Sequence, residues 1–190
     1  MHLLFTCTAN QIRSPFAAAV ARRCIDELGL AVAVESAGQL PGDELADERM
    51  VAAARRHGID LSSHRSVQVS IDLVAASDLI VTMTGRHVVE LAEQFPESAR
   101  RTITLREWAH ATQEGQGIDV WTPGSVMEWG DRVSRRPLGE LLSGRADVAD
   151  PVGRWRRAHR RTAQQIQLLV TTCFGRAPDV PDGDEVVAPA

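Results

Sequence analysis

A strand, a short polar loop and a helix start follow one another at the N-terminus, and this unit most constrains the possible fold. The apolar run Leu3–Phe5 predicts a short buried strand over His2–Thr6. The loop Cys7–Ser14 reads C-T-A-N-Q-I-R-S, and Pro15 follows it at a position that the first helical turn tolerates. Cys7 is therefore expected where a buried strand ends and a helix begins.

Strand-like and helix-like segments alternate along the rest of the chain. Further strands are predicted over 31–36, 78–83 and 101–105, and helices over 16–28, 44–57, 71–76, 86–94, 124–142 and 151–174. This alternation indicates an α/β fold with a parallel sheet and helices on both faces. Ligands of such sheets bind beyond the carboxyl ends of the strands, where Cys7 is placed.

The length of 190 residues fits one domain, which we expect over residues 1–175. Residues 106–149 interrupt the alternation and are interpreted as an insertion that holds Trp108, Trp121 and Trp129. We favour an anchoring role for these tryptophans over a lid above an aryl ring. The Pro-rich and acidic segment 176–190 is expected to be a disordered tail.

Composition excludes several classes of protein. A formal charge of −4 gives no general attraction to nucleic acid or to an anionic membrane, so neither is expected as a partner. The chain has no run of 18 apolar residues and no secretion-signal pattern at its start. Its three cysteines lie at irregular spacing, which favours reduced thiols and a cytoplasmic location over a disulfide framework. Cys24 and Cys173 are interpreted as buried structural thiols.

Cys7 and Arg13 are suited to chemistry on an oxyanion. A helix N-terminus and a nearby guanidinium favour the thiolate form of a cysteine, which is the nucleophile. The planar donors of Arg13 match two oxygens of a phosphate, and backbone N–H groups of the loop add further donors. Nucleophile and anion cradle are thus expected in one loop.

The loop, with Asn10 at its centre and Ser14-Pro15 at its end, resembles that of the low-molecular-weight protein tyrosine phosphatases, C-x-G-N-x-C-R-S-P. The resemblance extends over residues 1–105 and 148–174, through Ser36–Gly38, Gly58–Ser66, Asp78–Met83 and Asp150-Pro151. It implies a three-layer α/β sandwich with a central four-stranded parallel sheet in the order 2-1-3-4. It also implies bacterial relatives and a reaction without metal or cofactor.

The resemblance assigns roles to residues of this chain. It implies that Cys7 is the nucleophile, that Asp150 is the general acid, and that Ser14 donates a hydrogen bond to the sulfur, although Ser14 could also be only an N-cap. Asn10, supported by Ser36 and His64, would lock the loop, since asparagine tolerates a left-handed backbone. The implied phosphate-binding loop consists of Thr8, Ala9, Asn10, Gln11, Ile12, Arg13 and Ser14.

Asp150 has rivals in Asp43, Asp131 and Asp147 when the residues alone are considered. An Asp-Pro pair is also a common helix start without any catalytic role. The resemblance selects Asp150, because the general acid of the family precedes the last helix. Such an acid would protonate the leaving oxygen and then activate water.

Three departures from the family pattern lie near the site. Ala9 replaces a glycine, which costs free energy if the position needs a positive φ. Ile12 replaces a second cysteine that gives many members redox protection, and Val152-Gly153 replace the tyrosines that line the substrate wall.

The expected function is hydrolysis of phosphotyrosine in a protein substrate through a phosphocysteine intermediate. One alternative is an arsenate reductase that uses a small external thiol, because no cysteine relay exists between Cys24 and Cys173. Another is a phosphate-binding protein with an impaired site. The arginines at 154, 156, 157, 160 and 161 could steer an acidic phosphopeptide, but a solvated helix face is the favoured interpretation.

Overall fold

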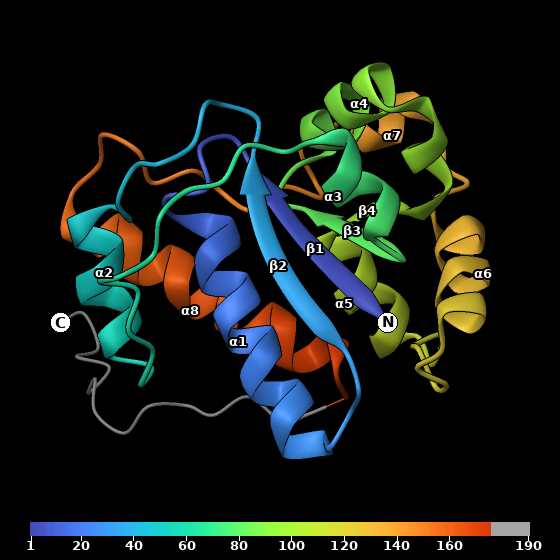
Figure 1. The fold of residues 1–190 in the computed structure, drawn as a ribbon, viewed down its shortest axis with the longest axis horizontal. Helices are drawn as coiled ribbons and strands as arrows, with labels where there is room; N and C mark the ends of the chain where they lie inside the picture. Colours follow the sequence, from blue (N-terminus) through green and yellow to red (C-terminus); the bar gives the residue numbers. More distant parts are fainter. Residues whose placement is uncertain (176–190) are drawn as a thin grey trace, which may run out of the picture.

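A computed structural model describes residues 1–175 of the chain as an α/β sandwich (Figure 1). Four parallel strands form one sheet in the order β2-β1-β3-β4, as predicted. The strands are β1 (His2–Cys7), β2 (Ala33–Gly38), β3 (Leu79–Thr82) and β4 (Thr102–Thr104). The helices are α1 (Arg13–Leu28), α2 (Glu48–Arg55), α3 (Ile71–Ala76), α4 (Gly85–Gln94), the 3-10 helix η1 (Pro96–Arg101), α5 (Leu105–Gln113), α6 (Pro123–Val133), α7 (Leu138–Leu141) and α8 (Arg156–Cys173).

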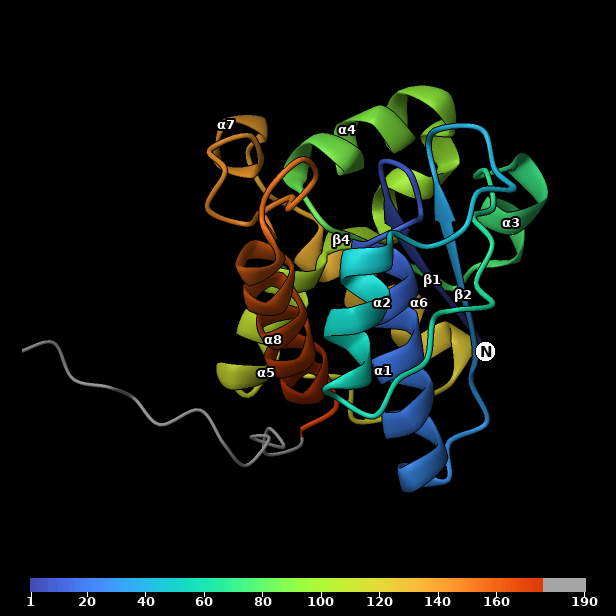
Figure 2. The ribbon, with the colours of Figure 1, turned by 90° about the vertical axis from the view of Figure 1, so that its left-hand side faces the viewer.

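Helices cover both faces of the sheet. Helices α1, α2, α5 and α8 lie together on one side, where α8 contacts the other three, and α3 and α4 lie on the opposite side (Figure 2). Successive residues of β1 serve the two sides in turn: Leu3 and Phe5 enter the larger core, and Leu4 enters the smaller one. Strands buried on both faces read as continuous apolar runs, which explains the N-terminal sequence.

The carboxyl ends of β1 and β2 meet at one edge of the sheet, where Cys7 pairs with Gly38. A Cβ atom at Gly38 would lie 2.7 Å from the backbone carbonyl carbon of Ala9 and from the amide nitrogen of Asn10. Real Cβ atoms do not approach backbone atoms this closely, so Gly38 lets the loop after β1 lie directly on β2.

Residues 106–149 differ from the expected structure in two respects. A single helix over 124–142 was wrong, because α6 ends at Val133 and α7 begins after Pro137. Proline disfavours helical backbone in the residue before it and donates no hydrogen bond itself, so a continuous helix is broken there. The segment also begins with α5, a helix that the periodicity did not reveal.

The three tryptophans of residues 106–149 pack into the body of the protein, which confirms the anchoring interpretation. Trp108 is fully buried, and its ring centroid lies 6.0 Å from that of Trp121 and 6.1 Å from that of Trp129. Phe174, after α8, stacks on Trp121 with centroids 5.0 Å apart. This aromatic cluster joins the insertion to the end of the last helix.

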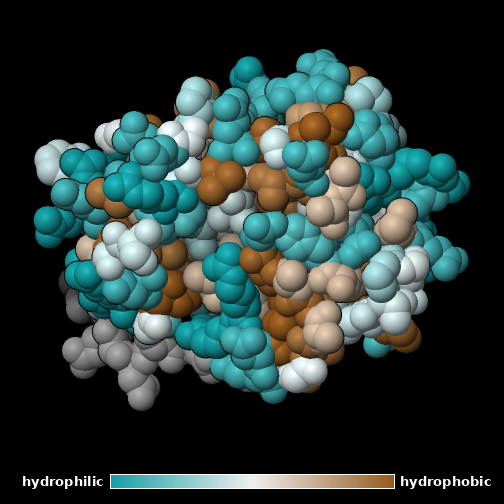
Figure 3. Space-filling view, in the orientation of Figure 1, coloured by the Kyte–Doolittle hydropathy of each residue, from teal (hydrophilic) through white to brown (hydrophobic). Residues whose placement is uncertain are grey.

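The surface in the view of Figure 3 is mixed, with apolar residues in several separate groups between hydrophilic ones. Among residues 1–175, no helix combines the length and the apolar character that crossing a bilayer requires. The expectation of a disordered tail falls on residues 176–190, outside the described part of the chain.

Candidate active site

The Cys7 thiol lies at the end of β1 and contacts the first turn of α1. Its Sγ is 3.0 Å from Oγ of Ser14, and both side chains are buried. Helix α1 begins at Arg13, and its N-cap, Ile12, makes no side-chain capping bond. The alternative that Ser14 is only an N-cap is therefore wrong, because its hydroxyl faces the sulfur from inside the helix.

Asn10 fixes the shape of the loop and adopts the left-handed backbone predicted for it, with φ of 54°. Its Nδ2 donates to Oγ of Ser14 and to Oγ of Ser36, both at 2.9 Å. Its Oδ1 accepts from the Val67 N–H at 2.9 Å, and its carbonyl oxygen lies 2.8 Å from Nε2 of His64. The four residues predicted to support the loop, Asn10, Ser14, Ser36 and His64, are thus in one hydrogen-bonded cluster.

The backbone of the loop turns its carbonyl groups toward surrounding segments. The Thr8 carbonyl accepts from the N–H groups of Gln39 and Leu40, and the Gln11 carbonyl accepts from that of Asp47. Within residues 1–175, no protein group accepts a hydrogen bond from the N–H groups of residues 9–12. Unpaired amides beside a helix N-terminus are donors for an anion such as phosphate.

Arg13 joins the loop to the segment before α8. Its side chain is buried, and one terminal nitrogen donates to the Val148 carbonyl at 3.2 Å. The other donates to Oγ1 of Thr8 at 3.3 Å and to Oδ2 of Asp150 at 2.5 Å. The structure therefore brings Asp150 to the loop although 137 positions separate it from Arg13.

The rival carboxylates lie elsewhere. Asp43 pairs with Arg65, and Asp131 pairs with Arg100. Oδ1 of Asp147 accepts from the N–H of Gly85 at 2.9 Å, which makes Asp147 a structural residue.

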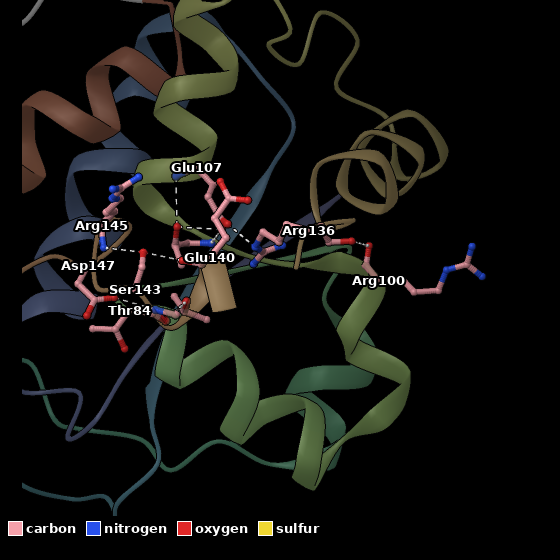
Figure 4. A network of polar contacts seen from close by, with 12 residues as sticks. Thr84, Arg100, Glu107, Arg136, Glu140, Ser143, Arg145 and Asp147 are labelled. Atoms are coloured by element: carbon pink, nitrogen blue, oxygen red, sulfur yellow. Dashed lines mark hydrogen bonds and ion pairs between the residues drawn. The ribbon is translucent and has the colours of Figure 1, made fainter. Parts of the chain in front are cut away.

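Residues 147–152, here called the acid loop, are anchored to the end of β3, to the start of α4 and to α5. The Val148 N–H donates to the Met83 carbonyl at 2.7 Å, and Nε of Arg106 donates to the Asp147 carbonyl at 2.8 Å. Figure 4 shows Asp147 in a polar network that includes the ion pair between Arg136 and Glu107. Helix α5 thus helps to hold the segment that presents Asp150.

His87 is a buried member of the site that the sequence did not reveal. It lies in the first turn of α4, and its Nε2 is 3.0 Å from Oγ1 of Thr8. Burial, and secondarily the guanidinium of Arg13, lower the pKa of His87 to about 4. Its position just after β3, at the ligand-binding edge of the sheet, is the one sequence signal that could have indicated it.

Comparisons with known proteins agree with this geometry. The sequence profile of the "Low molecular weight phosphotyrosine protein phosphatase" family matches residues 2–128. The chain belongs to this family. Similar proteins include the probable low molecular weight protein-tyrosine-phosphatase EpsP of Ralstonia nicotianae, with 30% identity over 64% of this chain and 93% of the relative. The protein-arginine-phosphatase of Bacillus subtilis is 33% identical over 75% of this chain and 92% of its own length.

Solved structures of the family share the fold. The YwlE mutant of Bacillus subtilis has a TM-score of 0.69 and 25% identity, and the match covers 92% of this chain and 97% of that protein. The family profile ends at residue 128, before Asp150. The structure, rather than the profile, therefore brings this carboxylate to the phosphatase loop.

The departures from the phosphatase pattern have a structural explanation. Ala9 is not among the residues with positive φ in the described chain, so its replacement of glycine costs no left-handed strain. A pocket of about 260 Å³ opens above Cys7, and Leu40 and Val152 form part of its wall. None of its lining residues is aromatic; they are Cys7, Thr8, Ala9, Gln11, Ile12, Arg13, Leu40, Asp150 and Val152.

The other two cysteines lie away from this pocket, as predicted. Cys24 and Cys173 are buried in α1 and α8. Burial raises the pKa of the Cys173 thiol, which keeps it protonated and unreactive. No group of three or more His, Cys, Asp or Glu side chains in the described residues could hold a metal ion.

Proposed function

We propose that this phosphatase hydrolyses phosphotyrosine in a protein substrate through a phosphocysteine on Cys7, with no cofactor and in the reducing cytoplasm. The observation that carries the proposal is the placement of Cys7, Arg13 and Asp150 around one pocket, with the buried Ser14 hydroxyl next to the sulfur. Sγ of Cys7 lies 3.0 Å from the Ser14 hydroxyl, and Arg13 lies 2.5 Å from Asp150.

Substrate binding begins with an exchange of partners at Arg13. The phosphoryl oxygens take the place of the Asp150 carboxylate on the guanidinium, because a dianion in the loop is the stronger partner. The N–H groups of residues 9–12 hold the remaining oxygens. Asp150 is then released at the pocket mouth, where it takes a proton from solvent and can approach the leaving oxygen as the protonated acid.

The first chemical step forms a sulfur–phosphorus bond. The Cys7 thiolate attacks phosphorus, the bond from phosphorus to the tyrosine oxygen breaks, and Asp150 gives its proton to that oxygen. Arg13 and the loop amides stabilise the charge on the transferring group. A hydrogen bond donated by the Ser14 hydroxyl to the sulfur stabilises the thiolate before attack and again when it departs.

The second step releases phosphate. The Asp150 carboxylate takes a proton from water, the water oxygen attacks phosphorus, and the bond from phosphorus to Sγ breaks. The thiolate returns to its hydrogen bond with Ser14. His64, Asn10 and Ser36 act through the loop shape rather than by contact with substrate.

Phosphoarginine is a second candidate for the phosphorylated residue. The 33% identical relative from Bacillus subtilis is named a protein-arginine-phosphatase. The pocket wall supports this candidate, because it contains no aromatic ring that could stack on a phenol. Leu40, Val152 and Gln11 form part of that wall. We favour phosphotyrosine, because the family profile carries that name and the other relative reported above shares it.

The test is turnover of para-nitrophenyl phosphate by wild type, Cys7→Ser and Asp150→Ala between about pH 5 and 8. We expect no activity in Cys7→Ser and a loss of about 10²–10⁴-fold in Asp150→Ala. Asp43→Asn is the matched control, since it removes a carboxylate that does not line the pocket, tolerates the left-handed backbone of this position and should keep wild-type activity. Inactive wild type would refute the phosphatase assignment, and activity in Cys7→Ser would refute the mechanism.

Two peptides of one sequence, with phosphotyrosine or with phosphoarginine at the same position, then decide the substrate class. We expect a higher kcat/KM for phosphotyrosine. The reverse order would favour arginine dephosphorylation. Arsenate-dependent oxidation of a small thiol without ester hydrolysis would instead support the arsenate reductase alternative.

A further inference from the structure

An open groove lies beside the acid loop, along α8. Its volume is about 1050 Å³, and Asp150 lines both this groove and the pocket above Cys7. One side of α8 forms its floor, with Arg157, Arg161 and Leu168 at helical spacing. The pocket and the groove therefore adjoin at Asp150, so a peptide whose phosphorylated residue enters the pocket passes the start of the groove.

The charge of the groove is almost entirely positive. Arg154, Arg157 and Arg161 line it, and Asp150 is the one carboxylate among its lining residues. Arg156 and Arg160 lie on the same stretch of chain, and all five arginines are exposed. Within residues 1–175, the structure gives none of these guanidinium groups a carboxylate partner or a hydrogen-bond acceptor.

These arginines also oppose the stability of the helix that carries them. Helix α8 begins at Arg156, has no acidic residue in its first turn, and its N-cap, Trp155, makes no side-chain capping bond. Cations at a helix N-terminus are unfavourable, so Arg156 and Arg157 weaken the helix start. A negatively charged ligand would offset the unfavourable interaction of these arginines with the helix dipole, and it would give their guanidinium groups a partner.

We propose that the α8 groove binds an acidic stretch of the phosphoprotein substrate, next to the phosphorylated residue. The inference rests on the proposed function, because the acidic stretch reaches the groove only when the phosphorylated residue is bound in the Cys7 pocket. The span from Arg157 to Leu168 is about 16 Å at the helical rise per residue. An extended peptide covers that length in about five residues, so carboxylates within this distance of the phosphorylated residue reach the arginines. Trp155, 88% exposed at the groove rim, offers the peptide an apolar contact.

The experiment compares two phosphotyrosine peptides, one with Asp and Glu at the five positions on each side and one with Asn and Gln there. The test variant is Arg157→Gln/Arg161→Gln. The matched control is Arg100→Gln/Arg135→Gln, which removes the same charge from exposed arginines that pair with Asp131. Turnover of para-nitrophenyl phosphate, which has no flanking peptide, should be unchanged in both variants.

Each exposed arginine–carboxylate pair changes affinity by up to about fivefold, so we expect kcat/KM for the acidic peptide to fall about fivefold to 20-fold in the test variant. The loss should lie in KM and should shrink in 0.5 M salt, since the Debye length at about that strength is only a few ångströms. The neutral peptide should lose less than about twofold by the same reasoning.

An equal loss for both peptides, or an equal loss in the control variant, would overturn the proposal. Binding of wild type but not of the test variant to vesicles containing phosphatidylglycerol, with equal turnover of both peptides, would overturn it in favour of a membrane surface. Failure of the proposed function is distinguishable, because wild type would then either not turn over para-nitrophenyl phosphate or prefer the phosphoarginine peptide over the phosphotyrosine peptide.

Discussion

Replacement of Asn10 tests how the loop keeps its shape. The side chain is fully buried, its amide makes three hydrogen bonds, and its backbone φ is 54°. Asn10→Ala removes all three bonds and leaves the Val67 N–H without its acceptor. It also places a residue with Cβ and no compensating bonds in left-handed backbone.

The magnitude follows from these contacts. Each lost hydrogen bond lowers the free energy of unfolding by about 1 kcal/mol, and the left-handed backbone costs alanine about 1 kcal/mol more. We therefore expect Asn10→Ala to lower the free energy of unfolding by about 3–5 kcal/mol and the melting temperature by roughly 10 °C. Asn10→Gly loses the same bonds without left-handed strain, so it should be more stable than Asn10→Ala by up to about 1 kcal/mol.

Asn10→Asp separates stability from chemistry. Aspartate tolerates the left-handed backbone and keeps the acceptor for Val67, but it has no donor for Ser14. Its carboxylate would lie within about 6 Å of Sγ of Cys7, where like charge disfavours the thiolate. The acidic limb of the kcat/KM profile should therefore move to higher pH, whereas Asn10→Gly should mainly lower kcat.

Urea unfolding measured by circular dichroism gives the stabilities, and para-nitrophenyl phosphate kinetics from about pH 5 to 8 gives the profiles. The reasoning would be refuted if Asn10→Ala lowered the free energy of unfolding by less than about 1 kcal/mol, since loss of three buried hydrogen bonds should cost more than that. It would also be refuted if Asn10→Asp and Asn10→Gly had the same pH profile.

Three further predictions follow from the site and the core. The pKa of His87 is about 4 in the folded protein, whereas that of an unfolded histidine is about 6.5, so stability is lost as pH falls between these values. Urea unfolding should show that wild type loses up to about 3 kcal/mol more than His87→Asn when the pH is lowered from 7 to 4. Gly38→Ala should lower kcat/KM at least about tenfold in para-nitrophenyl phosphate assays, because its Cβ would displace the Ala9–Asn10 backbone from a near-attack geometry. Trp108→Ala should cost about 3–5 kcal/mol in urea unfolding and leave the KM for this substrate near the wild-type value.

Much of the fold and of the loop was predictable because the signals are local. The apolar run Leu3–Phe5 and the Ser14-Pro15 helix start predict β1 and α1 from neighbouring residues alone. The break between α6 and α7 was also local, at Pro137, and a stricter use of proline would have found it. The start of α8 at Arg156 rather than at Pro151 also has a local cause, because Gly153 has a φ of 71°, which is not helical.

Contacts between distant segments explain what the sequence did not indicate. His87 reaches Thr8 across 79 positions, and Leu40 forms the pocket wall only because β2 ends beside β1. A histidine early in a helix and a leucine in a loop carry no pattern of their own. Asp150 shows the same dependence, since its identification needed the family resemblance and its placement needed Arg13.

The position near the loop that requires glycine depends on the neighbouring strand as well as on the loop sequence. The sequence placed the possible strain at Ala9, where the family has glycine. In the structure the left-handed backbone is at Asn10, whose side-chain bonds compensate for it, and the close approach is at Gly38 on the neighbouring strand. Alanine is accommodated at position 9 because other residues supply the backbone freedom and the space. The replacement of glycine by alanine therefore introduces no left-handed strain at position 9.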